Sequence, residues 1–290
     1  MGQTTSIFPQ AKKIYRSVFH SPRADFFLRG VLNFLVNTLA VANGWSFPKK
    51  FNWDWKMEML LYRYEAETVA LFKKIIKPGM RVVDIGAHIG YYTALFSKLV
   101  GPKGQVYAFE ADADNFALLT KNLNNFHNVT LVNKAVADRD GIVTFYKVNN
   151  STGCHSIVAP KLASIKMSVP AIRLDTFLKE NGIATVEVIK IDIEGGEPAA
   201  FLGMSELFFT AKHLQIVSEF NQSALNAAGV DPIIFLKNMS RIGFIIYSIT
   251  AGVEQPAPLV LENLTVPLAD KTTYNNILLE KRGSLRPIEN

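Results

Sequence analysis

At 290 residues, with 49% hydrophobic and 19% charged side chains, the chain has the composition of a folded globular protein, which excludes a mainly disordered one. The formal net charge of +6 and the sequence pI near 9.2 favour acidic partners only mildly, since much of that charge is spread thinly. Cys154 is the only cysteine, which excludes an intrachain disulfide and a thiolate metal cluster and fits a reducing compartment.

Residues 1–57 differ in character from the rest and form a predicted N-terminal helical extension. No signal peptide is predicted, because the start of the chain lacks a basic stretch followed at once by an apolar run. Residues 26–42 are strongly apolar, and their polar members Arg29, Asn33 and Asn37 would form one narrow stripe on a helix. A bilayer span needs about 20 apolar residues with few polar interruptions. We therefore expect this helix either to pack on the main domain or to lie on an anionic membrane surface.

Residues 58–290 show the pattern of a doubly wound α/β domain. A helix is predicted over residues 58–76, followed by a short buried strand over 80–85 and a helix over 91–99. The alternation continues with strands at 105–109, 129–133, 186–191, 214–220, 244–249 and 275–280, and helices at 113–125, 175–181, 198–209 and 232–240. Strands separated by helices of this length indicate right-handed crossovers. We predict a Rossmann-like, mostly parallel seven-stranded sheet with an antiparallel last strand.

Two segments after the third strand interrupt this alternation. Residues 141–148 and 166–174 alternate at period two and flank a polar loop over residues 149–164. This pattern predicts an inserted pair of strands. The loop between them could cover a ligand.

The first strand runs into a glycine-containing turn, VVDIGAHIGYYT, that predicts a ligand site. Gly86 has no Cβ, so a ligand can touch the backbone there, and the start of the next helix offers N–H groups to an anion. Dinucleotide binders have a glycine where His88 stands, which argues against a pyrophosphate. Glu110 ends the second strand, where an acid can accept hydrogen bonds from both ribose hydroxyls or merely favour a helix N-terminus. A glycine-rich turn without a ligand is the alternative.

The strand at 186–191 carries polar residues where a central parallel strand is normally apolar. In VIKIDIEGGEPAAFLG, Lys190, Asp192 and Glu194 share one side of an extended segment. Such residues are costly in a central strand unless they are paired or used. The strand therefore predicts a second wall of the same site.

Seven segments follow one another along the chain: DIGAHIGYYT, FEAD, NKAVADRDG, IRLDTFL, IKIDIEGGEPAAFLG, VSEF and YNNILLEKR. In this order they resemble successive elements of the FkbM family of methyltransferases, from about residue 65 to residue 282. The resemblance implies a class I methyltransferase fold, S-adenosylmethionine as cofactor, and a hydroxyl of a sugar, glycolipid or polyketide-type product as acceptor. The chain departs from the family at His88, where asparagine is common, and in the loop with Cys154 and His155.

The resemblance also implies a set of cofactor contacts. At the end of the third strand Lys134 replaces a frequent acid, so an adenine contact there is expected from backbone groups near Ala135. The predicted cofactor-binding residues are Asp84, Gly86, Ala87, His88, Gly90, Tyr91, Glu110, Ala135 and Asp192.

Hydroxyl methylation needs a general base, because an alcohol is a poor nucleophile while it keeps its proton. The leading candidates are Asp192 and Glu194, with Glu219 after the fifth strand and His155 on the inserted loop as further ones. No metal is predicted, although Asp192, Glu194 and Glu219 together would suit Mg²⁺. The alternatives are a structural carboxylate pair held by Lys190 and, for His155, an ordinary polar loop residue.

Three other functions compete with O-methyl transfer. An NAD-dependent oxidoreductase would need a glycine near His88. A non-catalytic membrane- or partner-binding module is suggested by the apolar, basic N-terminus. RNA methylation is suggested only by the basic charge, and no nucleic-acid partner is expected, because aromatic and basic residues do not interleave as strand-tracking proteins require. We expect a cytoplasmic protein whose N-terminal segment contacts the cytoplasmic face of a membrane if it does not pack on the domain.

Overall fold

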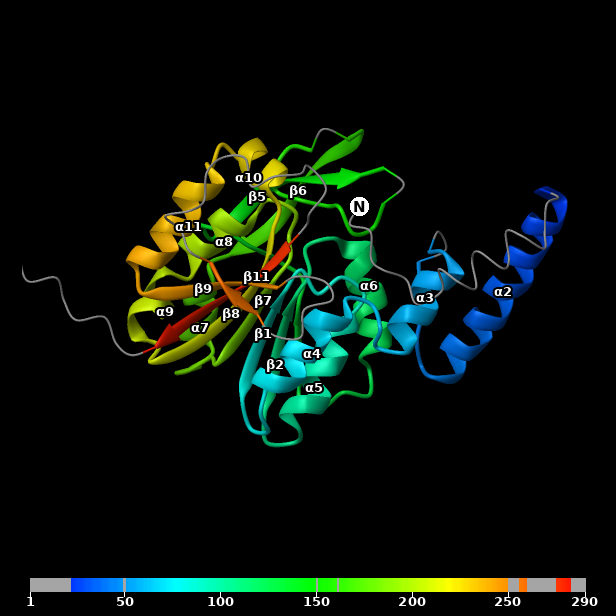
Figure 1. The fold of residues 1–290 in the computed structure, drawn as a ribbon, viewed down its shortest axis with the longest axis horizontal. Coiled ribbons are helices and arrows are strands. Elements are labelled where there is room, and N and C mark those ends of the chain that lie inside the picture. Colours follow the sequence, from blue (N-terminus) through cyan, green and yellow to red (C-terminus); the bar gives the residue numbers. More distant parts are fainter. Residues whose placement is uncertain are drawn as a thin grey trace, which may run out of the picture.

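A central parallel sheet organises the chain, of which the computed structural model describes residues 22–48, 51–149, 151–160, 162–249, 256–259 and 275–282. The described residues form an eight-stranded sheet of order β10-β9-β11-β8-β7-β1-β2-β3 (Figure 1). Its strands are β1 (Arg81–Ile85), β2 (Gln105–Phe109), β3 (Val129–Val132), β7 (Val188–Ile191), β8 (His213–Phe220), β9 (Phe244–Ile249), β10 (Ala257–Pro258) and β11 (Asn275–Arg282).

Strand direction confirms the predicted topology. β3, β2, β1, β7 and β8 pair in parallel, and β11 lies antiparallel between β8 and β9. The seven-stranded, mostly parallel sheet with an antiparallel last strand is confirmed, and the two-residue β10 adds an eighth strand at one edge. The strand order reverses between β1 and β7, and open α/β sheets form their ligand crevice at the carboxyl ends beside such a point.

Helices cover both faces of the sheet, because apolar runs in the strands send alternate side chains to each face. Val82 of β1 packs with the helices α4 and α5, whereas Val83 packs with α7, α8, α9 and α11 on the other face. The helices are α2 (Pro22–Ala42), α3 (Trp53–Leu60), α4 (Ala66–Ile75), α5 (Tyr91–Val100), α6 (Ala113–Asn122), α7 (Leu174–Glu180), α8 (Glu197–Gly203), α9 (Ser205–Thr210), α10 (Gln222–Ala227) and α11 (Pro232–Arg241).

The single helix predicted over residues 58–76 is wrong, since the chain forms α3 and α4 with a break between them. Tyr62 and Glu65 adopt left-handed conformations with φ of 51° and 49°, which ends one helix before the next begins. Tertiary hydrogen bonds hold this break: Tyr91 Oη donates to the Tyr64 carbonyl at 2.9 Å, and Tyr92 Oη donates to Glu65 Oε2 at 2.8 Å. The break therefore turns Glu65 toward the end of the sheet.

The region predicted as one helix over residues 198–209 also divides, into α8 and α9. Gly203 ends α8 where the backbone of Ala137 passes so close that a Cβ would collide with its carbonyl oxygen. Asp175 accepts hydrogen bonds from the N–H groups of Glu206 and Leu207 at 2.9 and 3.0 Å, so it caps the start of α9. The short helix α10 was not predicted.

The inserted strand pair is confirmed and belongs to a second sheet of order β4-β6-β5. β5 (Gly141–Val148) and β6 (Ser164–Ile172) pair antiparallel, and β4 (Ala135–Val136) adds a parallel edge. Lys147 of β5 bonds both Asp112 and Asp114 at 2.6 Å, and Asn115 Nδ2 donates to the Thr152 carbonyl at 2.9 Å. These contacts fix the insertion over the carboxyl end of β2.

The N-terminal helix α2 packs on α3, which lies between α2 and the main body (Figure 1). Val36 and Ala40 are buried there, and Lys56 Nζ donates to Asn37 Oδ1 at 3.0 Å and to Asn33 Oδ1 at 3.4 Å. No helix in the described part of the chain has the length and hydropathy to cross a bilayer. The boundary predicted between residues 57 and 58 falls inside α3, and the division into two domains stays a prediction.

We expect Gly203→Ala to lower the free energy of unfolding by about 1–3 kcal/mol, because the added methyl must push the Ala137 backbone aside. Urea unfolding measures this change. Gly30→Ala is the matched control, since a Cβ at Gly30 meets no atom within 4 Å and favours the helix. Equal stability of Gly203→Ala and the wild type would show that the α8 contact is looser than described.

Candidate functional site

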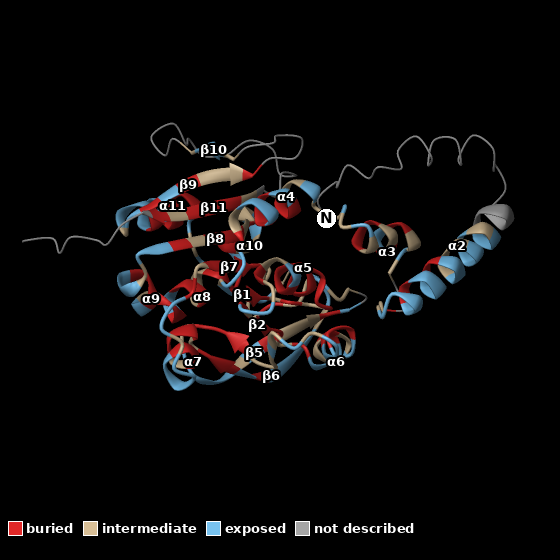
Figure 2. Cartoon of the chain, turned by 90° about the horizontal axis from the view of Figure 1, so that it is seen from below, coloured by how far each residue is buried: buried red, intermediate tan, exposed pale blue. Residues whose placement is uncertain are grey.

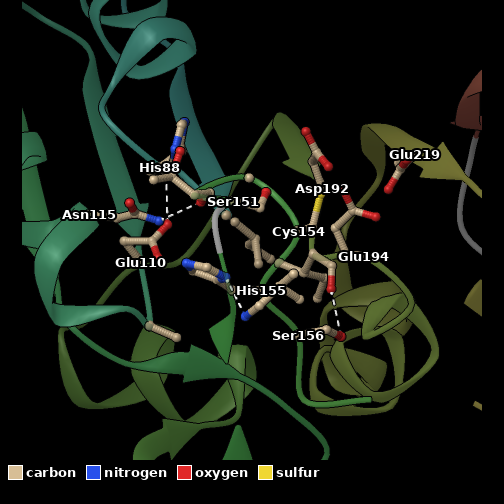
Figure 3. A pocket seen from close by; sticks show the side chains of 18 of the residues that line it. His88, Glu110, Asn115, Ser151, Cys154, His155, Ser156, Asp192, Glu194 and Glu219 are labelled. Atoms are coloured by element: carbon tan, nitrogen blue, oxygen red, sulfur yellow. Dashed lines mark hydrogen bonds between the residues drawn. The ribbon is translucent and has the colours of Figure 1, made fainter. Parts of the chain in front are cut away.

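An open cavity of about 1550 Å³ lies at the carboxyl ends of β1, β2 and β7. Its walls come from the turn after β1, the inserted loop, the end of β7 and the segment from α3 to α4. The sequence-predicted residues that line it are Gly86, Ala87, His88, Tyr91, Glu110, Ala135, His155, Asp192, Glu194 and Glu219. Figure 3 shows His88 and Glu110 on one side, with Asp192, Glu194 and Glu219 on the other.

Gly86 is required by the protein's own backbone, which corrects the reason expected for it. Its φ is +78°, and a Cβ there would collide with the carbonyl oxygen of Asp192 rather than fill space for a ligand. The Gly86 and Ala87 N–H groups donate to the Phe109 carbonyl at 3.0 and 2.9 Å. These two N–H groups are therefore bonded within the protein.

Asp84 and Gly90 hold this turn from behind and do not line the cavity. The Asp84 carboxylate is buried and accepts a hydrogen bond from Thr93 Oγ1 at 2.6 Å. Gly90 has a φ of +96°, and a Cβ there would lie 2.9 Å from Leu119 Cδ1, so its size lets α5 approach α6. The structure does not bring these two residues together with the other predicted cofactor contacts.

Glu110 presents a carboxyl group that the backbone orients into the cavity. Oε2 accepts the His88 N–H at 2.8 Å, and Oε1 accepts the Asp112 N–H at 2.9 Å (Figure 3). Burial raises the pKa of Glu110 to about 7, although the two backbone hydrogen bonds oppose the shift. Each oxygen keeps a lone pair that can accept a further hydrogen bond.

His88 contributes a neutral ring to the same wall. Burial, with Lys190 next in effect, lowers the pKa of His88 to about 4, so the ring is uncharged near neutral pH. Its Nε2 atom is buried without a hydrogen-bond partner among the described residues. Because an unpaired buried polar atom is costly, this nitrogen is a ready contact for a ligand.

Lys190 ties the two walls together, a role the sequence did not predict. Its Nζ lies 3.5 Å from Asp84 Oδ1 and 3.5 Å from Asp192 Oδ2, and it donates to the Gly86 carbonyl at 3.0 Å. Burial disfavours its charge, but the neighbouring carboxylates outweigh burial and raise its pKa. Lys190 thus pairs Asp192 with Asp84, not with Glu194. The signal for it was a lysine inside an apolar strand.

The expectation that Glu194 continues the side of the strand shared by Lys190 and Asp192 is wrong. β7 ends at Ile191, and Glu194 sits in the following turn with a φ of 53°. It nevertheless reaches the cavity. Burial, followed by the charges of Asp192 and Glu197, raises its pKa to about 7.

Glu219 and Glu65 add two more carboxyl groups to this wall. Burial and then the charge of Asp192 raise the pKa of Glu219 far above its usual range, and its Oε2 has no hydrogen-bond partner in the described ranges. Glu65 accepts hydrogen bonds from Tyr92 Oη at 2.8 Å and from Asn276 Nδ2 at 3.1 Å, and burial raises its pKa. Sequence reasoning missed Glu65, because its place depends on the helix break.

The remaining candidates come from the inserted sheet. Nδ1 of His155 accepts the Val148 N–H at 3.1 Å, which anchors the loop, and burial lowers the pKa of the ring. Ala135 lies in β4, paired with Ala171, and is buried at the cavity wall. No group of three or more His, Cys, Asp or Glu side chains is arranged to hold a metal ion in the part of the chain that the structure describes.

A family model described as the methyltransferase FkbM domain matches residues 84–246, more than half of the chain and the whole stretch from β1 into β9. The fold and the site thus define a methyltransferase of the class that uses S-adenosylmethionine. The chain belongs to the FkbM methyltransferase family, and S-adenosylmethionine is its cofactor. The dinucleotide oxidoreductase alternative is left without support.

Three curated relatives show how far the similarity extends. The 2-O-methyltransferase NoeI of Sinorhizobium fredii is 28% identical over 145 residues, covering 45% of this chain and 59% of NoeI. The ribosomal RNA large subunit methyltransferase E of Buchnera aphidicola is 28% identical over 165 residues, covering 52% and 70%. The 31-O-demethyl-FK506 methyltransferase FkbM of Streptomyces tacrolimicus is 28% identical over 161 residues, covering 45% and 62%. The chain thus matches less than two thirds of the first and third.

Glu110 should make the stability of the ligand-free protein depend on pH. Its pKa is about 7 in the folded chain, against 4.5 for an ordinary glutamate, so the folded state binds more protons than the unfolded state between these values. The free energy of unfolding therefore falls as pH rises through this window. We expect Glu110→Gln to reduce that fall by roughly 3 kcal/mol.

Urea unfolding at several pH values compares wild type and variant. The control is Glu180→Gln, which makes the same change at an exposed position at the end of α7. A variant at Glu110 with the pH dependence of the wild type would show that its carboxyl group is not held in a dry environment.

Proposed function

We propose that the chain is an O-methyltransferase that acts on a hydroxyl of a sugar, glycolipid or related natural product, with a carboxylate as general base. One observation carries the proposal: in a chain of this family, Glu110 and a group of carboxyls led by Asp192 and Glu194 face one cavity from its two sides (Figure 3). Glu110 would then contact the nucleoside on one side, and a carboxylate on the other side would accept the proton of the hydroxyl.

Hydroxyl acceptors are favoured by two of the relatives. NoeI is named a 2-O-methyltransferase, and the Streptomyces tacrolimicus protein a 31-O-demethyl-FK506 methyltransferase. Both names place the transferred methyl group on oxygen. The chain covers only 59% of NoeI and 62% of the Streptomyces tacrolimicus protein, so the acceptor class of this chain is part of the proposal.

The first side of the cavity fits S-adenosylmethionine, which supplies an electrophilic methyl group when bound. Glu110 would accept hydrogen bonds from the ribose hydroxyls, because its backbone contacts leave a lone pair on each oxygen. The unpaired Nε2 of His88 and the backbone near Ala135 are suited to polar groups of the nucleoside. Asp84, buried behind the turn, and Lys190, paired with it, would keep this side in place.

The carboxyls on the second side divide into two roles. A general base works best with a pKa near the operating pH, and burial gives Glu194 a pKa of about 7. Asp192, about two-fifths exposed and paired with Lys190, is the second base candidate. The raised pKa of Glu219 favours its protonated form, in which it would donate a hydrogen bond that orients the acceptor. His155 would act on the loop as an anchor.

RNA is a second candidate acceptor, favoured by the ribosomal RNA methyltransferase among the relatives. Residues 51–290, which contain the cavity, carry 24 Lys or Arg and 24 Asp or Glu. Affinity for nucleic acid depends mainly on neutralising phosphates with basic side chains. A catalytic region without excess positive charge therefore favours the small-molecule acceptor.

The proposed location is the cytoplasm, with residues 1–57 as an extension that contacts the cytoplasmic face of a membrane and residues 58–290 as the methyltransferase domain. The extension reaches the cavity, since Phe51 and Trp55 line its wall. An acceptor at the membrane surface would be amphipathic, with a polar part that carries the hydroxyl and an apolar part in the lipid.

Incubation with methyl-labelled S-adenosylmethionine and fractionated cell extracts tests the reaction and the acceptor class together. Label is expected in the glycan or glycolipid fractions. Label found only in RNA would favour the second candidate, and label in no fraction, together with absent cofactor binding by calorimetry, would overturn the proposal.

We expect Asp192→Asn and Glu194→Gln to lower turnover by about 10²- to 10⁴-fold while cofactor affinity changes little, because they face the acceptor side. Glu110→Gln should instead raise the cofactor Kd by about tenfold, as expected for a hydrogen bond to a charged group. Transfer assays paired with calorimetry separate the two effects, and Glu180→Gln is again the control. Unchanged turnover in both acceptor-side variants would remove these residues as catalytic groups.

A further inference from the structure

The apolar side of α2 points away from the protein. Among the helix's exposed residues, Phe27, Phe34 and Val41 are 73%, 70% and 72% exposed, and with Val31 they form one stripe at helical spacing. Val36 and Ala40, on the opposite side, are the residues buried against α3. Figure 2 shows most of α2 exposed, in contrast to the helices that cover the sheet.

Three polar side chains of α2 form hydrogen bonds within the protein. Asn33 Nδ2 and Thr38 Oγ1 donate to carbonyls four residues earlier on the same helix, each at 3.0 Å. The amide oxygens of Asn33 and Asn37 accept hydrogen bonds from Lys56. The side of α2 that carries Asn33 and Asn37 thus faces α3. Thr38 lies on the same side of α2 as Phe34 and Val41, and its hydroxyl proton is already bonded to the Phe34 carbonyl.

The excess positive charge of the chain is concentrated in the first 50 residues of the sequence, which corrects the expectation of thinly spread charge. Residues 1–50 contain seven Lys or Arg and one Asp, so they account for the whole formal excess of +6. The seven are Lys12, Lys13, Arg16, Arg23, Arg29, Lys49 and Lys50. An apolar helical face beside a basic segment complements a surface that is both apolar and negatively charged.

We infer that α2 docks on an anionic lipid bilayer, lying in the plane of the headgroups with Phe27, Phe34 and Val41 in the acyl boundary. The length and hydropathy of the helix suit a surface position, since it does not qualify as a span. Lipid is favoured over another protein because the apolar face lies beside basic sequence rather than beside mixed charge. Lipid is favoured over RNA because the exposed face of α2 offers no stacked aromatic and basic groups along a groove.

Docking has a consequence for the acceptor. α3 packs on α2 and also forms part of the cavity wall, so binding the bilayer brings that wall within one helix of the lipid surface. An acceptor anchored in the membrane is then held near the cavity, which raises its effective concentration. This consequence, unlike docking itself, rests on the proposed function.

Vesicle flotation of the full chain tests docking without cofactor or acceptor. The wild type is expected to float with phosphatidylcholine vesicles that contain phosphatidylglycerol and much less with phosphatidylcholine alone. Phe27→Asp/Phe34→Asp should weaken binding at least tenfold, because each change places a charge at the acyl boundary. The matched control is Leu202→Asp/Phe209→Asp, at side chains 62% and 65% exposed on α8 and α9, which should bind as the wild type does.

A second variant, Lys12→Gln/Lys13→Gln/Arg16→Gln, removes three positive charges from the sequence before α2. It should bind the anionic vesicles at least tenfold more weakly than the wild type and lose most of the preference for them over neutral vesicles. Calorimetry with S-adenosylmethionine verifies that each variant is folded and keeps its cofactor site. A methyl-transfer assay on the same samples separates the two proposals, because vesicle binding with no methyl transfer would leave docking intact.

Three outcomes would overturn docking on lipid. The first is wild-type binding no stronger to anionic than to neutral vesicles. The second is equal binding of Phe27→Asp/Phe34→Asp and the wild type. The third is a wild type that does not bind vesicles but forms a dimer or binds RNA, together with loss of that association in Phe27→Asp/Phe34→Asp.

Discussion

The buried ion pair between Lys190 and Asp84 is the constraint on which the cavity depends. It joins β1 to β7 where the strand order reverses, and the same ammonium group holds the Gly86 carbonyl and the Asp192 carboxylate. A buried carboxylate without its cation would be far more costly than the pair, so the two strand ends must stay in register. One side chain therefore positions both the turn that we propose to meet the cofactor and the residue that we propose to face the acceptor.

Much of the fold followed from periodicity, because strands buried on both faces must be apolar throughout. The strands of the main sheet were predicted on that basis, and the inserted pair was predicted from its alternation at period two. The break between α3 and α4 was not, since Tyr62 and Glu65 are not residues that normally end helices and only tertiary hydrogen bonds hold them. The split between α8 and α9 likewise depends on a backbone contact of Gly203 that no local pattern reveals.

Most residues of the site could be predicted from the sequence, but the structural reason for several of them could not. Ten of the expected residues line one cavity. Gly86, however, was explained by ligand contact, whereas the neighbouring backbone requires it, and Gly90 is required by the packing of α6. Asp84 and Lys190 belong to the support of the site, a distinction that depends on depth in the sheet rather than on residue type. The orientation of α2 was also hidden, because helical spacing defines a stripe but not which side of the helix meets the protein.

His88 and Glu194 stand on facing sides of the cavity, and both have a φ of 53°, a backbone region that side-chain-bearing residues seldom occupy. Each such residue stores about 1–2 kcal/mol of conformational energy, held in place by the surrounding hydrogen bonds. The surrounding structure thus holds both turns in a strained backbone conformation. A molecule that fills the space between them meets walls whose shape is already fixed, and the ordering that binding would otherwise require was completed when the chain folded.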